Sequence, residues 1–203
     1  MPKATSDIYQ LKITIRDSKP PIWRRVQVKS SITLPKLHQL IQAIMAWEDY
    51  HLHHFMVGDR RSRDGGHIYF YQPPALFDDD FLKDDELNTF LDEGKFKLNQ
   101  LLKAEKETII YEYDFGDSWE HLITLEKILP PAPMPHPICI KAVRACPPED
   151  CGGIWGYMGM LEVLKDTNHP EHKDIVEWLG GPGFDPVFVD LAAINSALKS
   201  IKT

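Results

Sequence analysis

Residues 108–127, TIIYEYDFGDSWEHLITLEK, decide the fold class of this chain. Two runs rich in β-branched and aromatic residues, 108–115 and 119–127, flank the short segment Gly116-Asp117-Ser118. Two runs of this kind, joined by a short loop that contains glycine, are typical of a β-hairpin. The stretch therefore predicts two antiparallel strands, and it is the clearest β element of the sequence.

Further strands are predicted on the N-terminal side of the hairpin. In residues 8–15 polar and apolar side chains alternate, which is the period of a half-buried strand. The alternation stops at Pro20-Pro21 and resumes in residues 22–28, so we expect these two strands to pair. Residues 51–57 and the aromatic run 67–71 also have the character of strands.

The helical spacing of apolar residues predicts the helices. The strongest helix is expected over residues 35–47, where Leu37, Leu40 and Ile44 recur at helical intervals after Pro35. Weaker patterns indicate helices over residues 157–164, 172–179 and 191–200, and short helical or irregular pieces over residues 87–91 and 98–102.

The remaining segments are predicted to be connectors. They are a polar turn at 60–66, an acidic exposed connector at 78–86, a linker with five prolines at 130–137, and a loop-rich segment with cysteines at 139–156. A chain of 203 residues can bury one sizeable core. We therefore predict a single α+β domain over residues 1–203, with a mainly antiparallel sheet, packed helices and a loop segment rich in proline and cysteine.

The composition argues against several classes of protein. The sequence is 43% hydrophobic and 26% charged, as in globular domains, and no apolar run approaches the roughly 20 residues that cross a bilayer. The N-terminus has no apolar signal-peptide core, so we expect a cytoplasmic protein. The formal net charge of −7 argues against broad DNA binding, which depends on cationic side chains at the phosphates.

A local basic patch could still bind a nucleic acid. Its members would be Arg24, Arg25 and Lys29 together with Arg60, Arg61 and Arg63. A solvated strand end and a charged loop explain the same residues equally well.

Five peptides spread over nearly the whole chain are unusual in composition. They are KPPIWRR at 19–25, HLHHF at 51–55, YEYDFGDSWEH at 111–121, PPEDCGG at 147–153 and FDP at 184–186. In this order they resemble the plasmid pRiA4b ORF-3-like family. That family occurs on bacterial and archaeal genomes, plasmids and transposable elements and has no established activity. The resemblance thus implies a nucleic-acid or protein partner from a mobile element, and it implies no reaction.

Three cysteines, Cys139, Cys146 and Cys151, lie close together in the sequence, with His136 upstream. Three thiolates and one imidazole are sufficient for a tetrahedral structural site, so zinc is a candidate cofactor. The spacing differs from that of a short zinc knuckle, and two prolines stiffen the loop. Reduced cysteines that act as small hydrophobic residues are the alternative.

A second candidate site combines histidines with acids. The two-residue period of a strand places His51 and His53 on one face, and the hairpin could add a third metal ligand from His121, Asp114 or Asp117. Such a set would suit a metal-dependent hydrolase. The alternative is architectural, with the imidazoles hydrogen-bonded to acids and packed against tryptophans.

The peptide PPEDCGG places Glu149 and Asp150 between rigid prolines and flexible glycines. This layout suits either the binding of a ligand or the locking of a loop. Asp114-Phe115-Gly116 matches a kinase tripeptide, but the other kinase motifs are missing, so we assign Gly116 to the hairpin turn. The sequence also lacks a phosphate-binding glycine loop and a nucleophile elbow.

Two functions follow from these patterns. The first is a binding or accessory module for a nucleic-acid or protein partner of a mobile element. The second is a metal-dependent hydrolase that uses His51, His53 and His121 with Asp114, Asp117 or Glu149. A common site requires the histidine strand, the hairpin turn and the PPEDCGG loop to converge on one cleft.

Overall fold

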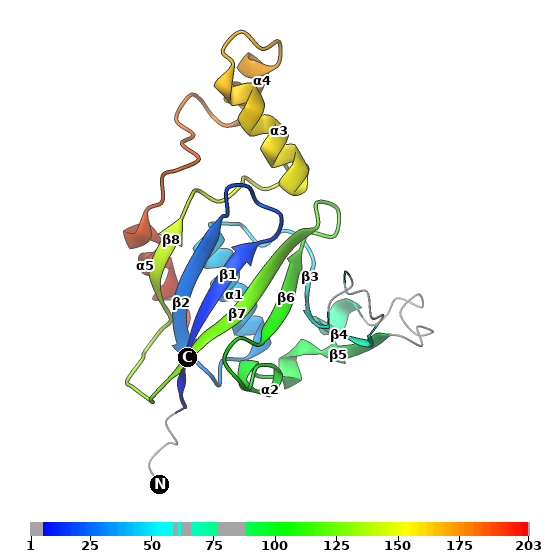
Figure 1. Cartoon of the computed structure of the whole chain (residues 1–203), viewed down its shortest axis with the longest axis vertical. Helices are drawn as coiled ribbons and strands as arrows, with labels where there is room; N and C mark the ends of the chain where they lie inside the picture. Colours follow the sequence, from blue (N-terminus) through cyan, green and yellow to red (C-terminus); the bar gives the residue numbers. More distant parts are fainter. Residues whose placement is uncertain (1–5, 59–60, 62–65, 77–87, 203) are drawn as a thin grey trace.

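The computed structural model describes residues 6–58, 61, 66–76 and 88–202. Within these residues an eight-stranded sheet runs in the order β5-β4-β3-β6-β7-β1-β2-β8 (Figure 1). The strands are β1 (Ile8–Ile15), β2 (Trp23–Lys29), β3 (His53–Val57), β4 (Ile68–Gln72), β5 (Asn88–Asp92), β6 (Thr108–Tyr113), β7 (Trp119–Leu129) and β8 (Ile138–Val143). Neighbouring strands are antiparallel, except that β4 and β5 are parallel.

The hairpin of residues 108–127 is confirmed. β6 and β7 pair in register from Thr108 opposite Thr124 to Tyr113 opposite Trp119. β1 lies on the other side of β7 and pairs with β2, as the alternation in the sequence predicted. Because side chains alternate across a strand, Leu11 of β1 is buried on the core face of the sheet and Lys12 points to the opposite face.

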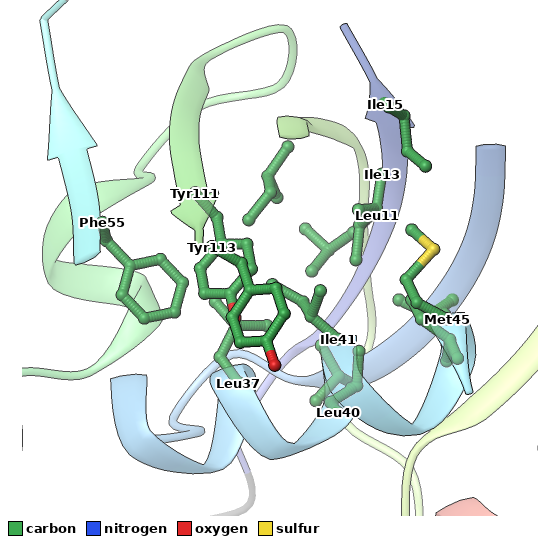
Figure 2. Packing of buried hydrophobic residues seen from close by; sticks show 14 of the residues in the cluster. Leu11, Ile13, Ile15, Leu37, Leu40, Ile41, Met45, Phe55, Tyr111 and Tyr113 are labelled. Atoms are coloured by element: carbon green, nitrogen blue, oxygen red, sulfur yellow. The ribbon is translucent and has the colours of Figure 1, made fainter. Parts of the chain in front are cut away.

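Five α-helices accompany the sheet in the described part of the chain: α1 (Leu34–Met45), α2 (Leu98–Leu101), α3 (Gly153–Lys165), α4 (His172–Trp178) and α5 (Leu191–Leu198). α1 covers one face of the sheet, where Leu37 and Ile41 meet Ile13 and Tyr111 (Figure 2). α5 packs against α1 and β8. α3 and α4 project past one end of the sheet (Figure 1). The fold class is α+β, as predicted.

Two expectations about secondary structure were wrong. Residues 87–91 were expected to be helical or irregular, but Asn88–Asp92 form the edge strand β5, which pairs with β4. The loop-rich segment 139–156 likewise contains most of β8, an edge strand that pairs with β2. Both strands are stabilised by partners far away in the sequence, which a local pattern does not contain.

Smaller differences concern boundaries. β3 begins at His53, so His51 lies in the connection before the strand. α3 begins at Gly153, four residues before the expected start. The acidic connector 78–86 lies outside the described residues, as does most of the turn 60–66. Across the described residues, no helix has the length and apolar character that a membrane span requires.

Candidate functional site

The turn of the β6–β7 hairpin presents the carboxylate of Asp114. Asp114 has a left-handed backbone with φ of 58°, and its Oδ1 accepts hydrogen bonds from the N–H groups of Gly116 (2.9 Å) and Asp117 (3.3 Å). The short polar side chain of aspartate tolerates this conformation because it bonds to nearby backbone groups. One oxygen of Asp114 therefore fixes the turn, and Oδ2 faces the connection before β3.

The PPEDCGG loop is docked on the same turn. The N–H of Gly152 donates a hydrogen bond to Oδ2 of Asp117 (3.1 Å). A Cβ atom on Gly153 would lie 2.3 Å from the carbonyl oxygen of Asp117, and Gly153 has a left-handed φ of 66°. Only glycine permits this approach of two backbones. The two glycines of the loop therefore lie directly against the hairpin turn.

Glu149 holds the loop against the sheet and the end of α1. Its Oε1 accepts a hydrogen bond from the Tyr113 hydroxyl (2.6 Å), and its Oε2 accepts one from the Glu48 N–H (2.7 Å). The indole N–H of Trp47 also donates to the Pro147 carbonyl (2.9 Å). Because both oxygens of Glu149 are engaged, this residue positions the loop and is poorly placed to act as a base.

The Tyr113 hydroxyl also positions His51. It accepts hydrogen bonds from the N–H groups of Tyr50 (3.0 Å) and His51 (3.3 Å) while it donates to Glu149. Burial and the Glu149 carboxylate raise the pKa of Tyr113, so the phenol keeps its proton and remains a donor. One hydroxyl thus connects β6, the segment before β3 and the PPEDCGG loop.

His51, Asp114 and Asp150 come together where these three segments meet. Nε2 of His51 lies 3.1 Å from Oδ1 of Asp150 and 3.7 Å from Oδ2 of Asp114. The ligand atoms of all three residues lie within 4.8 Å of one another, and no other such group of three occurs among the described residues. Asp114 is buried, His51 is half-buried, and the side chain of Asp150 is 69% exposed, so the group opens to solvent on one side.

Asp150 of this group also lines a cavity of about 830 Å³. Tyr50, Glu149 and Asp150 line it beside the end of α1, and Phe188 and Ile194 line it from the C-terminal segment. The size falls within the range of ligand pockets in proteins. One imidazole nitrogen and two carboxylate oxygens beside a cavity can hold a divalent metal ion and leave coordination positions for water or a ligand.

His53 and His121, which the sequence grouped with His51, lie elsewhere. Nε2 of His53 lies 3.1 Å from Oε2 of Glu93, and its ring stacks on His38 at 3.6 Å between centroids. His121 is fully buried, and its Nδ1 lies 2.9 Å from the Trp119 carbonyl oxygen. Burial lowers the pKa of His121 to about 4, so this imidazole is neutral in the fold. Both contacts fit the architectural alternative.

The four proposed zinc ligands are not assembled into one group. Cys139 is buried in β8, where its backbone N–H bonds to Asn195, and Nδ1 of His136 lies 2.9 Å from the carbonyl oxygen of Pro137. Burial raises the pKa of all three thiols, to about 12 for Cys151. Among the described residues, the group of three metal-ligating atoms that lie close together contains no cysteine. The described residues thus favour the His51 group over the cysteines as a metal site.

In the described part of the proposed basic patch, one arginine is buried and two are ion-paired. Arg24 is buried at 2% exposure and donates hydrogen bonds to the carbonyls of Ile44 and Val143. Arg25 forms a two-point ion pair with Glu126. Arg61 pairs with Asp17 and Glu120. Arg60 and Arg63 lie outside the described residues.

Residues 7–193 match the family described as "Plasmid pRiA4b ORF-3-like protein". The chain belongs to this family. It is 33% identical over 196 residues to an uncharacterised protein of Sinorhizobium fredii, an alignment that covers 97% of this chain and 93% of that protein.

A solved structure resembles this family member over almost its whole length. The crystal structure of a protein of unknown function from Methanosarcina mazei Go1 has 39% sequence identity and a TM-score of 0.76, and the match covers 93% of this chain and 98% of that one. The names of these relatives carry no function, so the function of this chain must be argued from its own residues.

Sequence reasoning missed the residues that assemble the site. The polar atoms of Tyr113 and Trp47 hold the PPEDCGG loop, and neither residue was predicted from the sequence to have a role in the site. Both lie beside motif residues, and a buried tyrosine or tryptophan normally finds a partner for its polar atom. That rule predicts a partner but does not identify it.

Proposed function

We propose that this chain is a divalent-metal-dependent hydrolase whose metal ligands are His51, Asp114 and Asp150. The observation that supports the proposal is the convergence of one imidazole and two carboxylates, from three separate segments, within 4.8 Å. Two carboxylates balance the charge of a divalent ion. Three protein ligands with an open side are typical of catalytic sites, whereas structural zinc sites use four.

The ligand set favours a transition metal. Imidazole suits zinc, iron and copper, and carboxylates suit magnesium and manganese, so a mixed set is best matched by zinc or manganese. A metal ion at such a site lowers the pKa of a bound water and supplies a nucleophile near neutral pH.

The protein itself provides rigidity and a place for the substrate. Asp114 and Asp150 both have left-handed φ angles of 58°, and such backbone conformations often occur at functional sites. Tyr113 and Glu149 fix the segments that carry His51 and Asp150. Asp150 also lines the cavity of about 830 Å³, so the cavity offers the substrate a surface next to one of the proposed ligands.

The experiment is a metal-dependent activity assay. Chelator-treated protein is reloaded with zinc or manganese and tested on chromogenic carboxylic and phosphate esters. We expect hydrolysis only with metal, and a decrease of at least about 100-fold in Asp150→Asn, because metal catalysis supplies several kcal/mol. Asp174→Asn, at an exposed acid of α4, is the matched control. Equal hydrolysis by metal-free protein or by Asp150→Asn would reject the proposal.

A recognition module for a protein partner is the second candidate. It is favoured by large apolar side chains exposed in the C-terminal part, where Trp155 is 70%, Val187 is 64% and Phe188 is 65% exposed. The first partner to test is a second copy of the chain. Sedimentation velocity should then show association that depends on concentration and is weakened in Phe188→Ser, and monomer at all concentrations would argue against this candidate.

Nucleic-acid binding has less support, because Arg24 is buried and Arg25 and Arg61 are ion-paired. If it occurs, affinity for duplex DNA should decrease steeply as salt rises. No binding in low salt would exclude this version.

A further inference from the structure

A second cavity, of about 710 Å³, lies away from the His51 group. It is lined by α3, α4, the turn between β1 and β2, and the segment around residues 181–187. Its lining is mainly apolar and includes Ile22, Ile154, Leu161, Val176, Leu179 and Phe184. Cavities of this size and character are typical of small-molecule sites.

Among the described residues, Arg144 of the cavity lining has a buried donor that lacks a partner. Its Nε is buried and has no hydrogen-bond partner in the described part of the chain. Buried guanidinium N–H groups are normally bonded, because an unmet donor that has lost water costs free energy. An acceptor from outside the chain would remove that cost.

The backbone holds Arg144 in place for such an acceptor. Arg144 has a left-handed φ of 68°, which is uncommon for a long side chain. On one side the Val143 carbonyl accepts a hydrogen bond from Arg24 (3.1 Å), and on the other the Ala145 N–H donates to the Pro186 carbonyl (3.1 Å). Strained residues that are fixed by their surroundings often clamp ligands.

The charge of the cavity lining is positive, although the whole chain has a formal net charge of −7. Lys19, Lys165 and His172 line the cavity with Arg144, and Glu162 is the acid among the lining residues. Glu162 is paired with Lys165 at 2.7 Å. The cavity therefore combines an apolar body with a cationic group, which complements a molecule that has an apolar tail and an anionic head.

We propose that this cavity binds a small amphipathic carboxylate. The carboxylate accepts hydrogen bonds from the guanidinium of Arg144, and the apolar tail lies among Ile154, Leu161 and Phe184. Guanidinium and carboxylate can form two parallel hydrogen bonds, which are strong when water is excluded. The site is independent of the His51 group, and its failure would leave the proposed hydrolase function intact.

The test measures the binding of decanoate by isothermal titration calorimetry, with decanol and decylamine as matched probes. Wild-type protein should bind decanoate, bind decanol at least about 10-fold more weakly, and not bind decylamine. Arg144→Gln should weaken decanoate binding about 10-fold or more and leave decanol binding unchanged, because a charged hydrogen bond is lost. Lys173→Gln, at an exposed position of α4, is the control and should bind decanoate as the wild type does.

A second variant keeps the test decisive if Arg144→Gln does not fold. Leu161→Trp fills the apolar part of the cavity and should weaken the binding of both decanoate and decanol. The proposal is overturned if wild-type protein does not bind decanoate, or if decanoate and decanol bind equally well. It is also overturned if folded Arg144→Gln binds decanoate with unchanged affinity.

Discussion

A single hydroxyl group determines how three segments of the candidate site meet. The Tyr113 hydroxyl makes three hydrogen bonds, to Glu149 and to the N–H groups of Tyr50 and His51. No local feature of the sequence around Tyr113 identifies these partners. A substitution that removes this hydroxyl should therefore disturb the candidate site and leave the hydrophobic core intact.

Tyr113→Phe should destabilise the site without disrupting the sheet. Loss of the hydroxyl leaves one acceptor and two donors without their partner, which costs about 1–3 kcal/mol of unfolding free energy. Because residues that orient metal ligands affect affinity, zinc binding should weaken about 10-fold. Urea unfolding and calorimetric zinc titration measure the two effects. Tyr69→Phe, at an exposed position of β4, should change neither.

Because two histidines are buried, we expect the free energy of unfolding to decrease in acid. Burial lowers the pKa of both His38 and His121 from 6.5 to about 4, and for His38 the nearby His53 adds to the effect. Between pH about 4 and pH 6.5, the unfolded chain therefore binds more protons than the folded chain. The stabilisation from the neutral rings is complete above pH about 6.5 and is lost as the pH falls towards about 4.

The expected loss is on the order of 3 kcal/mol for each histidine. It can be followed by urea unfolding between pH 7 and pH 4. His38→Gln should have a flatter pH dependence than the wild type, and His67→Gln, at an exposed position, should retain the full dependence. An unfolding free energy that does not change over this range would contradict the neutral state of the two rings.

At the scale of elements, the edge strand β8 is held by the side chain of one residue of α5. Asn195 of α5 covers the β8 edge: its Oδ1 accepts from the Cys139 N–H (2.9 Å) and its Nδ2 donates to the Cys139 carbonyl (2.9 Å). An amide side chain thus takes the place of a neighbouring strand. This protects an edge that could otherwise pair with another chain.

Asn195→Ala should therefore loosen β8. The variant loses both hydrogen bonds to Cys139 and a third to the Leu191 carbonyl, so we expect a destabilisation of about 1–2 kcal/mol and faster hydrogen exchange at the Cys139 amide. Hydrogen exchange measured by NMR tests the local effect. Asn168→Ala, in the exposed connection after α3, is the control. Unchanged protection of Cys139 would show that α5 does not stabilise this edge.

A pair of glycine substitutions tests the docking of the PPEDCGG loop. Gly153→Ala places a Cβ 2.3 Å from the Asp117 carbonyl oxygen at a positive φ, so it should destabilise by about 2 kcal/mol or more and weaken metal binding. Gly159→Ala lies in the interior of α3 with open space around its Cβ and should stabilise by about 0.5–1 kcal/mol. Thermal unfolding distinguishes the two; similar shifts in both variants would contradict the docking.

At the scale of the whole molecule, local patterns predicted the local elements. The hairpin β6–β7, the pair β1–β2 and helix α1 all have partners or periodicity that lie close in the sequence. β5 and β8 were missed because they pair with β4 and β2 at the two edges of the sheet. Tertiary context outweighs a weak local pattern at such edges.

The candidate site was predicted in part for the same reason. The sequence named the histidine strand, the hairpin turn and the PPEDCGG loop as the segments that a common site requires, and proposed His51, His53 and His121 with Asp114, Asp117 or Glu149 as the metal set. It paired His51 with His53 by the period of a strand, but the strand begins only at His53, so the two side chains have different partners. The sequence did not show which acid would be a metal ligand and which would hold the loop in place. That difference depends on contacts between distant segments, such as the hydrogen bond from Tyr113 to Glu149.

The most direct test of the central claim is the stoichiometry and location of bound zinc, measured by elemental analysis after dialysis and by titration of the metal-free protein. Our account predicts one zinc ion per wild-type chain and none in a folded Asp114→Asn/Asp150→Asn double variant, whereas a Cys139→Ser/Cys146→Ser variant keeps the ion. Folded wild-type protein that binds no zinc, or zinc binding that survives in the aspartate variant and disappears in the cysteine variant, would contradict it.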